Sequence, residues 1–111
     1  MRGVTIISEK IENLIKNKEI SQEEVQNLLT RFCKNDWGVL DNEEKEEQYE
    51  LLMEWKCKGE NPKLRYCFNG IYEVEKYLIN IRSKYELSIK TLVITVHLIK
   101  KMSWFYKKVQ I

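Results

Sequence analysis

Thr91-Leu92-Val93-Ile94-Thr95-Val96-His97-Leu98-Ile99 is the stretch of this 111-residue chain that decides the fold class. Six of its nine residues are β-branched, and such side chains favour strands because the second heavy atom on Cβ restricts χ1 in a helix. The stretch is also much shorter than the roughly 20 apolar residues that a membrane-spanning helix needs. It therefore predicts a strand.

The residues before this stretch predict further strands. Leu64, Tyr66 and Phe68 alternate with polar or small neighbours, and Asn69-Gly70 follows them. Asn-Gly is typical of a two-residue hairpin turn, so we expect a turn there and a return strand over 72–76. We predict a small antiparallel sheet of three or four strands in residues 63–99. A helical interpretation competes with it, because apolar residues also recur at helical spacing. Ile71, Val74, Leu78, Ile81 and Tyr85 fit one helical stripe, and Leu92, Val93, Val96 and Ile99 fit another.

The N-terminal half predicts helices. The apolar spacing after Ile7 predicts a first helix that begins near Thr5 or Ser8 and ends near Asn17. A second helix, over 22–34, is indicated by the capping box that Ser21 and Glu24 can form.

A third helix is predicted over 42–57. Asp41 and Glu44 repeat the N-cap pattern, and Gly59 suits the position just after the helix. Leu51, Leu52 and Trp55 are expected to face inward. We therefore predict a single domain over 1–111, of the α+β class, with N-terminal helices followed by a small antiparallel sheet; an all-α fold is the alternative.

Charge is sorted by position along the chain. Residues 1–55 hold 7 Lys and Arg against 13 Asp and Glu, whereas residues 56–111 hold 12 against 4, although the net charge of the whole chain is only +2. A domain with one acidic and one basic half is suited to charged partners.

The acidic charge is concentrated on the predicted third helix. Glu43, Glu47, Glu50 and Glu54 follow one another at i, i+4, i+7 and i+11, so they share one helix face, and Glu46 widens it. Such a row of carboxylates can imitate a run of phosphates and occupy the nucleic-acid-binding groove of a host protein. The competing interpretation is an ordinary solvated helix face.

The basic half suggests a second hypothesis, a small regulator that binds nucleic acid. Lys and Arg neutralise phosphates, and the aromatic residues among them can stack on bases. The competing interpretation places those aromatic residues in the core. The basic candidates are Lys63, Arg65, Arg82, Lys84, Lys100, Lys101, Lys107 and Lys108.

Catalytic and metal-binding patterns are missing from the sequence. His97 is the single histidine, it lies in an apolar stretch, and a structural role is expected for it. The cysteines Cys33, Cys57 and Cys67 are odd in number and lack the paired spacing of zinc ligands. We therefore expect no enzyme, no metal, no cofactor and no membrane span, and a reduced, cytoplasmic protein.

The segment from Arg31 to Asp36-Trp37-Gly38, followed by the acidic start of the third helix, resembles a family of small proteins carried by plasmids and phages. The resemblance covers about residues 21–52. It implies an α+β fold with a hairpin after the helices. Small proteins of mobile elements often counter host defence, so the resemblance also implies an anti-defence inhibitor, including the anti-CRISPR kind that acts on a host nuclease. The Asp-Trp-Gly motif itself is expected to form a structural corner.

A third hypothesis is a homodimer in which the acidic half of one copy faces the basic half of another.

Overall fold

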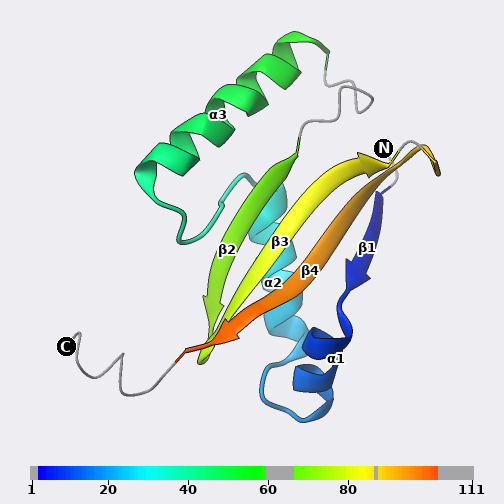
Figure 1. Ribbon diagram of the computed structural model, residues 1–111, viewed down its shortest axis with the longest axis vertical. Helices are drawn as coiled ribbons and strands as arrows, with labels where there is room; N and C mark the ends of the chain where they lie inside the picture. Colours follow the sequence, from blue (N-terminus) through cyan, green and yellow to red (C-terminus); the bar gives the residue numbers. More distant parts are fainter. Residues whose placement is uncertain (1–2, 60–66, 87, 103–111) are drawn as a thin grey trace.

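The computed structural model describes residues 3–59, 67–86 and 88–102 (Figure 1). It contains helices and strands in the order β1 (Gly3–Ile7), α1 (Glu9–Lys16), α2 (Gln22–Cys33), α3 (Asn42–Cys57), β2 (Phe68–Val74), β3 (Tyr77–Glu86) and β4 (Thr91–Lys101). The predicted α+β class is confirmed, and the all-α alternative is wrong.

The sheet is mixed rather than purely antiparallel, which corrects the sequence-based prediction. Its strand order is β1-β4-β3-β2; β2, β3 and β4 pair antiparallel, and β1 pairs parallel with β4. β1 was not predicted, because Ile7 also fits the apolar stripe of the first helix. Its Val4, Thr5, Ile6 and Ile7 are all β-branched, and this favours a strand before the chain turns into α1 at Ser8.

The predicted hairpin turn at Asn69-Gly70 is also wrong. Both residues lie inside β2, where they pair with Arg82 and Ile81 of β3. Gly70 provides room rather than a turn: a Cβ atom on it would lie 2.4 Å from the hydroxyl oxygen of Tyr72. The Asn69 side-chain oxygen accepts a hydrogen bond from the Asn80 amide. An Asn-Gly pair can therefore lie within a strand when one neighbouring side chain bonds the Asn oxygen and another occupies the space beside the Gly.

The turn that joins β2 to β3 is formed by Glu75 and Lys76. Val74 pairs with Tyr77, so two residues remain between the strands, and Glu75 has φ +54°. Glutamate rarely adopts a positive φ, which explains why the sequence pattern did not indicate this turn.

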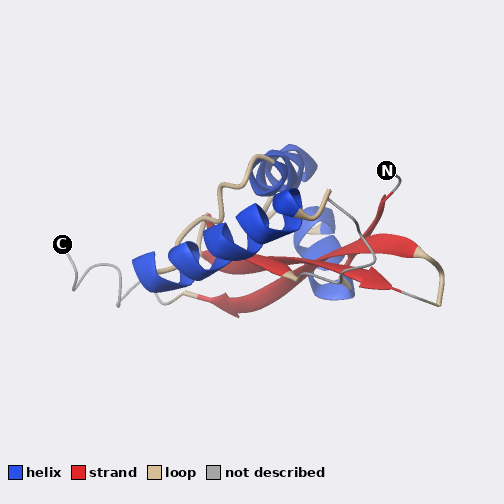
Figure 2. Ribbon diagram, turned by 90° about the horizontal axis from the view of Figure 1, so that it is seen from above, coloured by secondary structure: helices blue, strands red, loops and turns tan. Residues whose placement is uncertain are grey.

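One face of the sheet packs against the helices. Figure 2 shows helices over this face, and Figure 1 shows α3 on the β2 side of the sheet, with α2 crossing behind the strands. Tyr72, Ile79, Ile81 and Val96 point into the core, and all four are fully buried. They join Ile11 and Leu14 of α1 and Val25, Leu28 and Phe32 of α2 in one apolar cluster. The opposite face is not covered by a helix in the part of the chain that the structure describes.

The predicted helix ends are confirmed. Ser21 and Glu24 form both hydrogen bonds of a capping box, and Ser8 and Asp41 cap α1 and α3. Gly59 follows α3 with φ +79°. None of the described helices has the length and apolar character needed to cross a membrane.

Candidate protein-binding surface

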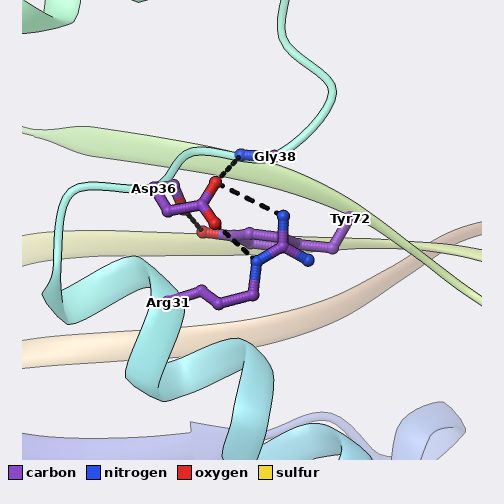
Figure 3. Close-up of polar contacts among 4 residues, drawn as sticks. All are labelled: Arg31, Asp36, Gly38 and Tyr72. Atoms are coloured by element: carbon purple, nitrogen blue, oxygen red, sulfur yellow. Dashed lines mark hydrogen bonds and ion pairs between the residues drawn. The ribbon is translucent and has the colours of Figure 1, made fainter.

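An Arg31–Asp36 ion pair fixes the corner between α2 and α3 (Figure 3). The Arg31 Nε atom donates to Asp36 Oδ2 at 2.7 Å, and Nη2 donates to Oδ1 at 3.3 Å. The Gly38 amide also donates to Oδ1, at 3.1 Å. These donors, Arg31 first, lower the pKa of the Asp36 carboxyl below its ordinary value. One carboxylate therefore ties the end of α2 to the residue that turns the chain.

Tyr72 supports this corner from the sheet. Its hydroxyl donates to the backbone carbonyl of Asp36 at 2.7 Å, and the Arg31 guanidinium lies 5.0 Å from the centre of its ring. Figure 3 shows the guanidinium over the Tyr72 ring, with the Asp36 carboxylate beside it. Burial raises the pKa of the Tyr72 hydroxyl, so this group stays protonated and keeps its donor role. Sequence reasoning gave Tyr72 no such role, because the contact spans 36 positions along the chain.

Residues 37–39 extend the sheet beside β2. The Ile71 amide donates to the Trp37 carbonyl at 3.1 Å, and the Val39 amide donates to the Ile71 carbonyl at 2.7 Å. Gly38 has φ +77°. Trp37 is buried in the core. The expectation that Asp36-Trp37-Gly38 forms a structural corner is therefore confirmed, and the corner determines where α3 starts.

α3 is attached to the sheet mainly through one side. Gln48 is buried, and its side-chain oxygen accepts from the Asn69 amide at the edge of β2, whereas its amide nitrogen has no partner among the described residues. Trp55 packs edge-on against Phe68 with ring centres 6.3 Å apart. Of the three residues predicted to face inward, Leu52 is buried, and Leu51 and Trp55 are half-buried.

The predicted acidic residues all lie on the other side of α3. Successive residues are 100° apart around a helix, so the side that carries these residues lies opposite Leu52. The face is about 16 Å long at 1.5 Å per residue. Glu54 forms an ion pair with Lys58 at 3.1 Å. We call this surface the acidic face; it consists of the exposed residues Glu43, Glu46, Glu47, Glu50 and Glu54.

Two exposed apolar side chains border the acidic face. Tyr49 is 57% exposed and Met53 is 41% exposed. Their i, i+4 spacing places them side by side, next to Glu46 and Glu50. Nothing in the sequence pattern marks these two as binding residues, because they only flank the inward-facing residues of the helix.

Carboxylate crowding extends to the start of α3. The hydrogen bond and the charge of Asp41 raise the pKa of Glu44, and Glu47 and Glu43 add to this effect. The acidic face and its N-terminal neighbours thus repel one another, and cationic groups of a partner would relieve that repulsion.

The predicted basic residues do not form one patch among the described residues. Arg82 and Lys84 are exposed on the uncovered face of the sheet, but Lys100 pairs with Leu78 of β3, four residues from Arg82. This is about 13 Å along a strand. Lys101 is exposed at the end of β4. Lys63, Arg65, Lys107 and Lys108 lie outside the described residues.

The described tyrosines of the basic half are not available to stack on nucleic-acid bases. Tyr72, Tyr77 and Tyr85 are buried on the helix-covered face of the sheet. They cannot stack on bases at the uncovered face, where Arg82 and Lys84 lie. The competing interpretation, aromatic residues in the core, is confirmed for these three.

The described residues contain no group of three or more His, Cys, Asp or Glu side chains placed to hold a metal ion. His97 is exposed on the uncovered face of the sheet. Three cysteines are exposed: Cys33, Cys57 and Cys67.

Comparison with models of known families, with characterised proteins and with solved structures finds no match to this chain. The likeness of its Arg31 to Gly38 segment to small mobile-element proteins therefore stays a prediction.

Proposed function

We propose that this protein is a non-catalytic interaction protein of a mobile element, and that it inhibits a host defence nuclease such as a CRISPR effector. The observation that carries the proposal is the acidic face. Its five carboxylates are all exposed and lie opposite the side by which α3 is attached. A partner can therefore reach the whole row without displacing core residues.

The chemistry of the acidic face fits a basic nucleic-acid-binding groove. DNA presents one negative charge per about 1.7 Å of helix axis, and grooves that hold it are lined with Lys and Arg. The acidic face presents five carboxylates over about 16 Å, of which Glu54 also pairs with Lys58, so it can replace part of a phosphate run. Like charges at i, i+4 cost an isolated helix a few tenths of a kcal/mol, and pairing with cations would remove this cost.

The bordering apolar residues add a second kind of contact. Interfaces obtain much of their affinity from a few aromatic or other large side chains, and charged residues around them guide the approach of the partner. Tyr49 and Met53 can supply the first kind of contact, and the acidic face the second.

Direct binding of nucleic acid receives less support from the described residues. Arg82 and Lys84 share their sheet face with Glu73 and Glu86, and the neighbouring tyrosines are buried.

The test is inhibition of DNA cleavage by a panel of CRISPR effector nucleases. We expect one effector to be inhibited by the wild-type protein, and the Glu47→Lys/Glu50→Lys variant to lose that inhibition. The matched control is Glu12→Lys/Glu23→Lys, which makes the same change of charge at exposed positions on α1 and α2. Equal inhibition by both variants would contradict the role of the acidic face. Absence of inhibition across the panel would contradict the proposed target class.

A further inference from the structure

A cavity of ≈ 200 Å³ lies between the two longer helices and the sheet. Its walls come from the ends of α2 and α3 and from residues of β2, β3 and β4. It lies on the opposite side of α3 from the acidic face, because Leu52 and Trp55 line it and the glutamates point away. What the cavity binds is thus a separate question from the function proposed above.

Aromatic side chains dominate the walls. Phe32 and Trp37 contribute from the α2 side, and Trp55 and Phe68 contribute from α3 and β2. The edge-on packing of Trp55 against Phe68 places two ring systems at an angle to each other along one wall. Flat apolar molecules pack well against ring faces and edges of this kind.

The charge of the lining restricts the occupant. None of the described residues that line the cavity is charged, and its polar groups belong to Cys33, Asn35, Ser83 and the hydroxyl of Tyr85. Ser83 is buried in β3, whereas Cys33 and Asn35 are exposed and so lie toward the opening. An ion would lose its hydration there without gaining an opposite charge. A neutral molecule with one or two polar atoms fits this lining better.

The volume restricts the occupant further. Pockets for drug-sized ligands have volumes of about 300–1,000 Å³, so this cavity is too small for most of them. An engineered apolar cavity of about 150 Å³ is large enough to bind benzene. The present cavity therefore suits a molecule of one or two fused rings.

We propose that this cavity is a binding site for a small neutral aromatic molecule of about the size of indole. The occupant lies against Trp37, Trp55 and Phe68. A polar atom on it lies near the side chain of Ser83, Cys33 or Asn35. Binding requires neither the acidic face nor a protein partner.

The test is a titration of the ¹⁵N-labelled protein with indole, followed by ¹H–¹⁵N correlation spectra. We expect saturable one-to-one shifts at the backbone amides of Phe68 and Ile94 and at the side-chain indole groups of Trp37 and Trp55. The expected Kd is about 1 mM or tighter for a ligand of this size. Absence of saturable shifts, or shifts confined to residues away from the cavity, would overturn the proposal.

Two cysteines offer a matched pair of variants. Cys33 and Cys57 are both exposed near the ends of helices, but only Cys33 lines the cavity. Cys33→Trp should fill the opening and weaken indole binding at least tenfold, whereas Cys57→Trp should leave it unchanged. Ser83→Leu fills the cavity from the sheet and should have the same effect as Cys33→Trp. Wild-type affinity in both filling variants, with well-dispersed spectra that show them folded, would also overturn the proposal.

Discussion

Gly38 lies so close to Ile71 that a Cβ atom placed on it would be 1.8 Å from the Ile71 carbonyl oxygen and 2.8 Å from Tyr72 Cδ1. The same Ile71 carbonyl accepts the Val39 amide at 2.7 Å. The approach of the two backbones thus depends on the missing side chain, and it joins the chain before α3 to the edge of the sheet.

Gly38→Ala should therefore lower the free energy of unfolding by about 3 kcal/mol. The added methyl group meets backbone, which cannot move without breaking the Val39–Ile71 hydrogen bond. Gly59→Ala is the matched control, because Gly59 has nearly the same φ (+79°) but nothing within 4 Å of the added atom. It should cost only about 1 kcal/mol, the penalty for a left-handed alanine. Urea unfolding measures the loss of stability in both variants. Equal losses would show that the close approach of Gly38 to Ile71 does not stabilise the fold.

Asp36→Asn should make the protein less sensitive to acid. The folded-state pKa of Asp36 lies below its ordinary 3.8, mainly through the hydrogen bond from Arg31. The ionised carboxylate therefore adds stability that is fully present above pH 3.8 and is lost as the pH falls through the lower folded-state pKa. At pH 7 we expect the variant to be less stable by about 1 kcal/mol, since the ion pair is half-exposed.

This difference between Asp36→Asn and the wild type should shrink below pH 3.8, as measured by urea unfolding over a pH series. Asp41→Asn is the control: it also removes one carboxylate at the corner, but asparagine caps a helix as well as aspartate does. A difference for Asp36→Asn that stays constant with pH would mean that the charge of Asp36 does not stabilise the corner.

Local signals in the sequence predicted the helices well. Ser21 with Glu24 and Asp41 with Glu44 act within three residues of each other, and the structure has both caps where they were expected. The β-branched run from Thr91 is a strand for a similarly local reason. The acidic face needed only helical periodicity, so its five residues could also be assigned to one exposed side.

Contacts between distant residues could not be predicted in this way. Gly70 looked like a turn residue, but the Tyr72 hydroxyl occupies the space beside it, and Tyr72 points there because it bonds Asp36. The parallel pairing of β1 with β4 joins residues about 90 positions apart, such as Val4 and Val93. The sequence pattern placed Tyr49 and Met53 beside the inward-facing residues of α3, and the tertiary packing of the helix leaves both exposed.

Neutralising charges on α3 should change stability in opposite directions at two places. Glu46 and Glu50 are a like-charge pair at i, i+4, so Glu46→Gln/Glu50→Gln should raise the free energy of unfolding by about 0.3 kcal/mol. Lys58 pairs with Glu54 at 3.1 Å, so Lys58→Gln should lower it by about the same amount. Both differences should fade in 1 M salt, where screening is strong. Thermal unfolding at low and high salt measures them, and changes of the same sign would show that pairwise charges on α3 do not control its stability.

Tyr49→Ala should weaken binding to the inhibited nuclease at least tenfold, and mainly by faster dissociation. A large aromatic side chain that becomes buried on association holds the complex together, whereas surrounding charges mostly speed the encounter. Glu46→Gln/Glu50→Gln should therefore slow association and flatten its salt dependence, with a smaller effect on dissociation.

Ile89→Ala is the control, because Ile89 is as exposed as Tyr49 (56% against 57%) but lies in the turn before β4. All these side chains are exposed, so the free energy of unfolding of each variant should lie within about 0.5 kcal/mol of the wild-type value. Surface plasmon resonance at two salt concentrations separates the rates. If Tyr49→Ala and Ile89→Ala dissociate alike, then Tyr49 is not part of the interface.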